Sequence, residues 1–161
     1  MREYVSGLDP KEIGNVAKEL RKYKTELRHN ILALIDVMCE EGEHLAVLGI
    51  THFDTGETAA SIKGYREGDI GLIVAGGHAV WVEFGAGMGR AEWVGTDYPE
   101  GVVRHGEYGQ GKGMNPPWVY KAEDGTFHKS YGIDADSFMY YAAKDLAAKT
   151  PELAMRIFNG K

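Results

Sequence analysis

The chain contains little of what marks secreted or membrane-spanning proteins. Cys39 is the one cysteine among 161 residues, so no disulfide can form within the chain, and this usage suits a reducing compartment. No apolar run approaches the roughly 20 residues that a membrane-spanning helix needs, and we expect no membrane partner. The opening residues Met1–Tyr4 lack the apolar core of a signal peptide, and we therefore expect a soluble protein that is not exported.

An excess of basic residues is also missing. The chain has 18 lysines and arginines against 24 aspartates and glutamates, a net charge of −6. Because nucleic-acid binding depends on neutralising phosphates, this balance argues against a broad basic face and a sequence-specific nucleic-acid partner. The apolar fraction of 43% and the charged fraction of 26% are ordinary for a globular protein, and residues 1–161 fit one domain with its own core.

The first third of the chain predicts one long helix over about residues 10–49, with a pause at Gly42. Asp9 can cap this helix and Pro10 fits its first turn. Apolar residues recur in steps of three and four along one face, namely Ile13, Val16, Leu20, Tyr23, Leu27, Ile31, Leu34, Ile35 and Met38. One small domain cannot cover such a helix, so we expect it to pack along other subunits as well.

A hairpin is predicted next, over about residues 58–75. Thr58–Tyr65 and Ile70–Ala75 form its strands, and Arg66–Asp69 turns the chain between them. The apolar stretch 78–87 follows the hairpin. Its apolar residues can share either a helix face or a strand face, and periodicity does not decide between the two in so short a run.

Residues 88–117 are predicted to form a long glycine-rich loop. Nine of the 22 glycines lie between Gly85 and Gly113. Loops longer than about 12–15 residues are usually functional. Candidate interface aromatics in or beside this loop are Trp93, Tyr98, Tyr108 and Trp118. They either anchor a partner surface or pin the loop to its own domain, and the sequence favours neither alternative.

The last part of the chain predicts a second hairpin and a final helix. The hairpin covers about residues 118–130, because the Asp124-Gly125 pair supplies the positive φ that its tip needs. The helix covers about residues 135–158, with Asp134 as a plausible cap. Pro151 is expected to end or kink it near Thr150, or to start a short new helix.

No pattern of catalytic or ligand-binding residues emerges. The six histidines show no metal-ligand spacing, and the glycine cluster at residues 85–89 lacks the lysine of a phosphate-binding P-loop. No serine lies in a Gly-x-Ser-x-Gly elbow. We therefore expect no metal, no cofactor and no catalytic residues.

Glu83 allows two interpretations. Its apolar neighbourhood would suit a general acid, but glycosidase-like chemistry needs a second carboxylate, and spacing selects none among Asp54, Asp69, Glu92 and Asp124. Alternatively, Glu83 is an internal anchor that accepts hydrogen bonds from backbone amides of the glycine turn that follows it. We favour the anchor, because lone buried acids are more often structural than catalytic.

Three segments resemble, in order, those of one family. Residues 54–62 resemble its Thr-Gly-x-Leu-x-x-Ser-Ile segment, and residues 78–85 its Tyr-Ala-x-x-Val-Glu-Phe-Gly segment. Residues 118–139 resemble its closing hairpin and Ala-x-Pro-Phe-Met helix start. The family is the tail-completion, or head–tail joining, proteins of long-tailed bacteriophages and prophages. The residues that carry the resemblance are Thr55, Gly56, Ser61, Ile62, Ala79, Val82, Glu83, Phe84, Gly85, Asp124, Gly125, Phe138 and Met139.

The chain departs from that pattern at four positions. Thr58 stands where leucine is frequent, and His78 replaces a tyrosine. Ala86 replaces a threonine, and Ser137 replaces a proline. These departures leave the apolar framework intact but put the local geometry of each segment in doubt.

The resemblance implies an α+β fold, in which a long N-terminal helix and a C-terminal helix pack on a small curved antiparallel sheet. It also implies a non-enzymatic virion protein of the tail and neck, assembled in the host cytoplasm. Such a protein forms a homo-oligomeric ring, commonly a hexamer, that joins the tail tube protein to the head completion or connector protein. Two alternatives stay open, namely a hydrolase with Glu83 as general acid and another capsid or neck component.

Overall fold

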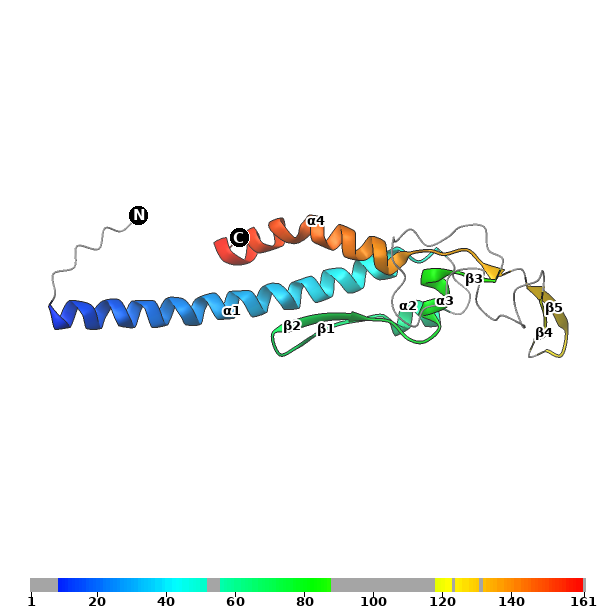
Figure 1. Cartoon of the computed structure of the whole chain (residues 1–161), viewed down its shortest axis with the longest axis horizontal. Helices are drawn as coiled ribbons and strands as arrows, with labels where there is room; N and C mark the ends of the chain where they lie inside the picture. The colour runs from blue at the N-terminus through cyan, green and yellow to red at the C-terminus, as the bar shows by residue number, and fades with distance from the viewer. Residues whose placement is uncertain (1–8, 52–55, 88–117, 123, 131, 161) are drawn as a thin grey trace.

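The computed structural model describes residues 9–51, 56–87, 118–122, 124–130 and 132–160. Within them the fold is α+β, as predicted, with a long N-terminal helix and a C-terminal helix packed against a two-stranded antiparallel hairpin (Figure 1). In chain order the elements are α1 (Pro10–Leu48), α2 (Glu57–Ser61), β1 (Lys63–Glu67), β2 (Ile70–Val74), α3 (Ala79–Phe84), β3 (Ala86–Gly87), β4 (Trp118–Lys121), β5 (Phe127–Ser130), β6 (Gly132–Ile133) and α4 (Phe138–Asn159).

Helix α1 begins as predicted. The Asp9 carboxylate accepts a hydrogen bond from the Lys11 amide at 3.0 Å, and Pro10 occupies the first turn. The predicted pause at Gly42 is wrong, because α1 continues through this residue to Leu48. Gly42 is buried, and a Cβ atom there would lie 2.1 Å from Cδ1 of Ile73 in β2. The glycine therefore allows close packing of β2 on the helix rather than interrupting it.

The β1–β2 hairpin lies directly on α1. The two strands are antiparallel and in register from Lys63 opposite Val74 to Glu67 opposite Ile70. At Gly64 the strand backbone touches the helix backbone, and the Gly64 amide donates to the Glu43 carboxylate at 2.6 Å. The hairpin thus covers one side of α1, while α4 covers another (Figure 1).

The first predicted strand begins too early in the sequence. Residues 57–61 form helix α2 instead, and β1 starts at Lys63. Gly56 starts this turn with φ +78°, and the Ser61 hydroxyl donates to the Thr58 carbonyl at 2.7 Å. Such a local bond from serine offers the backbone a helical turn in place of a strand.

Helix α4 starts at Phe138 rather than at residue 135, and Asp134 is not its cap. Its N-cap residue is Ser137, at φ 53°, and the Ser137 side chain makes no capping hydrogen bond. Pro151 neither ends nor restarts α4, which continues as one helix to Asn159. Helix α4 packs along the part of α1 that leads into the body (Figure 1).

An ion pair joins the C-terminal part of α1 to α4. The Lys149 ammonium donates to the Glu41 carboxylate, and this hydrogen bond lowers the pKa of Glu41 from its usual value of 4.5. Lys149 keeps about half of its side chain exposed, so water screens the pair.

Glu41→Gln is expected to lower the free energy of unfolding by at most about 1 kcal/mol at neutral pH. Because the native pKa of Glu41 is lowered, its contribution is present above 4.5 and is lost as the pH falls through the native pKa. Urea unfolding of both proteins across this range should show the difference disappearing in acid. The exposed neighbour variant Glu40→Gln should show no such dependence, and a constant difference for Glu41→Gln would contradict the assignment.

Two short strand pairs lie beyond the helical part of the molecule (Figure 1). Strand β3 pairs with β6, and β4 pairs with β5 in the second predicted hairpin. The tip is as predicted, with Gly125 at φ +85°. Thr126 donates from its amide at 2.9 Å and from its hydroxyl at 2.6 Å to Asp124, and these bonds lower the pKa of that carboxyl.

The first half of α1 extends well past the ends of α4 and of the β1–β2 hairpin (Figure 1). We call residues 10–28 the arm. Arg28, at its end, contacts Asp69 in the hairpin turn at 3.2 Å. Along the arm, Ile13, Leu20 and Tyr23 are 52%, 62% and 62% exposed. The arm is therefore an amphipathic helix whose apolar face the rest of the described chain leaves open.

Gly14→Ala is expected to stabilise the arm by about 1 kcal/mol, because glycine is a poor helix former and a Cβ atom there would meet nothing within 4 Å. Amide hydrogen exchange of Asn15 to Lys18 should slow about fivefold. Amides of α4 serve as the internal control and should be unaffected, whereas unchanged exchange in the arm would contradict the expectation.

Candidate functional site

Glu83 is the most unusual residue of the described chain, because it is a carboxylate only 6% exposed within the core region. The stretch that contains it is helix α3, which settles the choice that periodicity left open. One carboxylate oxygen accepts a hydrogen bond from the Met139 amide at 2.7 Å, and the other accepts one from the Tyr140 amide at 3.2 Å. The side chain is therefore an internal anchor, as favoured from the sequence.

The two amides belong to the first turn of α4, more than 50 residues away. The sequence predicted amides of the glycine turn after Glu83 as donors, and it did not predict these two. The first four amides of a helix have no partner within the helix, and the helix dipole favours negative charge beside them. Glu83 takes the place that a capping side chain of Ser137 would normally fill, because Ser137 makes no such bond itself.

Main-chain bonds reinforce this contact. The Asp136 amide donates to the Val82 carbonyl at 2.8 Å, and the Ser137 amide donates to the Glu83 carbonyl at 3.1 Å. These carbonyls are at the end of α3, where helices leave acceptors without partners. We call this set of bonds the Glu83 clasp. It provides hydrogen-bond partners both for backbone carbonyls at the C-terminal end of α3 and for backbone amides at the N-terminal end of α4.

Ser137 shows how this clasp differs from the family pattern. Its φ of 53° is a left-handed conformation, and its amide is used as a donor. Proline, which the related pattern has at this position, holds φ near −65° and has no amide hydrogen. The backbone of this chain at Ser137 is therefore one that a proline cannot adopt, so the local geometry of the helix start is its own.

The apolar motif residues of the core gather around the same point, whereas Asp124 and Gly125 form the tip of the β4–β5 hairpin. Ile62 and Phe138 are fully buried, and Ala79 and Val82 are buried beside them. With Ala46, Ile50 and Ala142 they make up the core cluster, against which Met139 packs. All three segments of the resemblance thus contribute to one core.

The polar and glycine motif residues shape the edges of this core. The Ser61 hydroxyl accepts a hydrogen bond from the Gly76 amide at 2.9 Å, which joins α2 to the end of β2. Gly85 ends α3 with φ +75°, a conformation that requires glycine, while Phe84 is half-buried.

Thr55 lies outside the described residues, as do the candidate interface residues Trp93, Tyr98 and Tyr108. Trp118 begins β4, where its backbone pairs with Ser130.

Sequence reasoning missed Asp136. Its carboxylate accepts hydrogen bonds from the Thr51 amide, at 2.7 Å, and from the Thr51 hydroxyl. This contact joins the end of α1 to the approach to α4. The two residues are 85 positions apart, and an aspartate before a serine has no local signal that points to such a partner.

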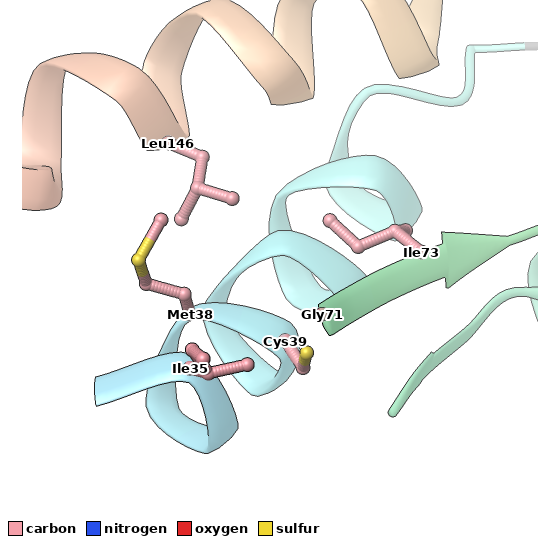
Figure 2. A pocket seen from close by; sticks show the side chains of 6 residues that line it. All are labelled: Ile35, Met38, Cys39, Gly71, Ile73 and Leu146. Carbon is pink, nitrogen blue, oxygen red and sulfur yellow. The ribbon is translucent and has the colours of Figure 1, made fainter. Parts of the chain in front are cut away.

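The pockets of the described surface include two with largely apolar linings. The first, of about 190 Å³, lies between α1, β2 and α4 and is lined by Ile35, Met38, Cys39, Gly71, Ile73 and Leu146 (Figure 2). In Figure 2, Met38 and Leu146 approach each other from α1 and α4, while Ile73 faces them from β2. The buried Cys39 thiol donates to the Tyr65 carbonyl at 3.3 Å. The lining offers apolar contact and no charged group.

The second pocket, of about 340 Å³, lies beside the Glu83 clasp between α3 and the start of α4. Glu83 is the one acidic residue that lines it among the described residues. Acid–base hydrolysis of a glycoside needs two carboxylates facing the substrate. Here the single carboxylate binds two backbone amides, an arrangement that holds two helices together.

Within the described residues, no group of three or more histidines, cysteines, aspartates or glutamates is placed to hold a metal ion. In the same part of the chain, no helix combines the length and the apolarity needed to cross a membrane.

Comparison of the chain with protein-family models, with curated proteins and with solved structures finds no match.

Proposed function

We propose that the chain is a structural virion protein, similar to the tail-completion proteins of long-tailed bacteriophages. In this role it forms a homo-oligomeric ring, commonly of six copies, at the head-proximal end of the tail. The ring joins the tail tube protein to the head completion or connector protein. The subunit is made and assembled in the host cytoplasm, and it carries neither a cofactor nor catalytic residues.

One observation carries this proposal, namely that the three segments of the resemblance meet in one core. Ile62 comes from the first segment, Val82 from the second and Phe138 from the third, and all three are buried in the same cluster. Segments that form the core of one family should pack together, and these three do. Their meeting supports the view that they are parts of one body.

The role of Glu83 supports a structural rather than a catalytic protein. It is the most chemically distinctive residue of the resemblance, and its carboxylate is bound to the amides of Met139 and Tyr140. A residue used in this way fixes the relative position of α3 and α4. The chain that follows Gly85, in which the candidate interface aromatics lie, therefore leaves the body at a defined point.

The test is deletion of the gene from the phage or prophage that carries it, followed by electron microscopy of lysates. We expect filled heads and separate tails, and recovery of joined particles when the wild-type gene is supplied from a plasmid. Normal infectious particles after deletion would overturn the proposal. Loss of the heads themselves would also overturn it, in favour of another capsid component.

A further inference from the structure

The two edges of the β1–β2 hairpin differ in what occupies them. In an antiparallel pair, residues that exchange both main-chain hydrogen bonds alternate with residues whose amides and carbonyls point away from the partner strand. The Gly64 amide donates to Glu43 of α1, so Gly64 points outward, and so does Ile73 opposite it. By the same alternation, Gly71 opposite Arg66 points outward too. The edge of β1 is thus bound to α1, and the edge of β2 presents the main chain of Gly71 and Ile73.

The edge of β2 has no partner strand in the part of the chain that the structure describes. Among the described strands β1 is its one neighbour, and no hydrogen bond from another described residue reaches the outward amides and carbonyls of Gly71 and Ile73. These two residues present donors and acceptors that repeat at about 7 Å along the strand. An extended chain matches that spacing, because its own outward donors and acceptors also lie on every second residue.

The sequence of β2 lacks the features that keep natural edge strands from pairing. Such edges usually have charged side chains, proline or a bulge. Strand β2 is Ile-Gly-Leu-Ile-Val, and it pairs with β1 without a bulge. The charged residues of the two strands, Lys63, Arg66 and Glu67, all lie in β1, whose edge α1 already occupies. The open edge is therefore regular and uncharged, which favours the addition of a strand.

The apolar pocket between α1, β2 and α4 lies along this edge (Figure 2). Gly71 and Ile73 line it on the β2 side, and Leu146 lines it on the α4 side. The Ile73 side chain points towards α1, where its Cδ1 lies against Gly42. A strand added beside β2 would turn every second side chain in the same direction, into the pocket. The volume of about 190 Å³ and the lining without charged groups suit one side chain such as leucine, methionine or phenylalanine.

We propose that β2 binds an extended segment of a partner protein as a third strand, with one apolar side chain of that segment in the α1–β2–α4 pocket. Main-chain hydrogen bonds to Gly71 and Ile73 supply the register, and the pocket supplies the selectivity for an apolar residue. A third strand also supports the hairpin itself, because a sheet of two strands is only marginally stable.

Helix α4 decides the form of the partner. It lies across the pocket from β2, with Leu146 approaching Met38 on that side (Figure 2). The β2 strand of a second copy carries its own α1 and α4, and these helices would collide with α4 before the two edges met. A single extended segment has no such attachment and fits between β2 and α4. This inference goes beyond the proposed function and does not rest on it, because it follows from the hairpin and the pocket alone.

Selection from a displayed library of random nonapeptides tests the binding. The full chain is the bait, and Met38→Glu protein, which has a carboxylate in the pocket, removes peptides that bind elsewhere. We expect enriched peptides that share one apolar position and that bind Met38→Glu about tenfold or more weakly than the wild type. Leu48→Glu adds the same charge at an exposed position of α1 and should bind like the wild type. Recovery of no peptide that distinguishes the wild type from Met38→Glu would overturn the proposal.

Amide hydrogen exchange of the wild type tests the mode of binding without any substitution. In the free protein, the Gly71 and Ile73 amides should exchange faster than the Leu72 amide, because Leu72 is bonded to β1. A selected peptide at saturation should slow Gly71 and Ile73 far more than Leu72, which is the internal control. Slow exchange of both amides in the free protein would show that the edge is already covered. That result, or unchanged exchange with the peptide bound, would overturn the proposal.

Discussion

Glu83→Gln is expected to lower the free energy of unfolding by about 2–3 kcal/mol, the contribution of hydrogen bonds to a buried charged group. The carboxylate accepts from the Met139 and Tyr140 amides with its two oxygens. Glutamine has one oxygen, so its amide group must turn a donor towards one of the two backbone donors. The substitution also removes the negative charge at the start of α4, which the helix dipole favours.

Urea denaturation monitored by circular dichroism measures this loss. Glu40→Gln provides the matched control, because it makes the same chemical change at an exposed position of α1 and should alter stability by less than about 0.5 kcal/mol. Glu83→Ala should cost more than Glu83→Gln, since it leaves both amides without this acceptor. Equal stability of Glu83→Gln and Glu40→Gln would mean that the Glu83 clasp does not hold α3 to α4.

Gly64→Ala is expected to destabilise the protein by about 3 kcal/mol, at the upper end of what overpacking costs. A Cβ atom at Gly64 would lie 2.1 Å from the carbonyl oxygen of Cys39 and 2.7 Å from its carbonyl carbon. Both atoms belong to the backbone of α1, so no side-chain rotation relieves the clash. The hairpin would have to move away from the helix, which would also lengthen the bond from the Gly64 amide to Glu43.

Gly77→Ala is the control for this substitution, because a Cβ atom there meets nothing within 4 Å. Thermal unfolding of the two variants should therefore differ clearly, with Gly77→Ala close to the wild type and Gly64→Ala several degrees lower. If the two variants melted together, the backbone contact between β1 and α1 would not be as close as described.

Local sequence signals predicted the elements whose formation depends only on neighbouring residues. The Asp9 cap and Pro10 define the start of α1, and Asp124-Gly125 defines a hairpin tip, because each needs only its immediate neighbours. The same holds for the long apolar stripe of α1. The α+β fold class was implied by the family resemblance, and these elements agree with it.

Local sequence signals did not predict the conformation of segments whose structure depends on a partner elsewhere in the chain. Residues 79–84 have apolar spacing that suits a helix or a strand, and tertiary contacts with α4 accompany the helix. Residues 58–61 were predicted to begin a strand, but residues 57–61 form a helical turn that Ser61 ties to Gly76. The start of α4 depends on Glu83, which no pattern around Ser137 reveals.

For the candidate site, the sequence predicted that Glu83 is an anchor but could not predict what it holds. An acid in an apolar run must find donors, and this physical requirement is visible in the sequence. The identity of the donors is a matter of topology, since the amides of Met139 and Tyr140 reach Glu83 only when α3 and α4 pack together.

Because of the Glu83 clasp, the sequence between Gly85 and Asp134 can change independently of the body, which consists of α1, α4 and the β1–β2 hairpin. The clasp and the β3–β6 pair join the ends of that stretch. The entropic cost of closing a segment grows slowly with its length, by about 0.6 kcal/mol for each doubling. Insertions, deletions or a wholly different sequence could therefore accumulate there while α1, α4 and the β1–β2 hairpin keep their arrangement, which would let one body acquire new partners.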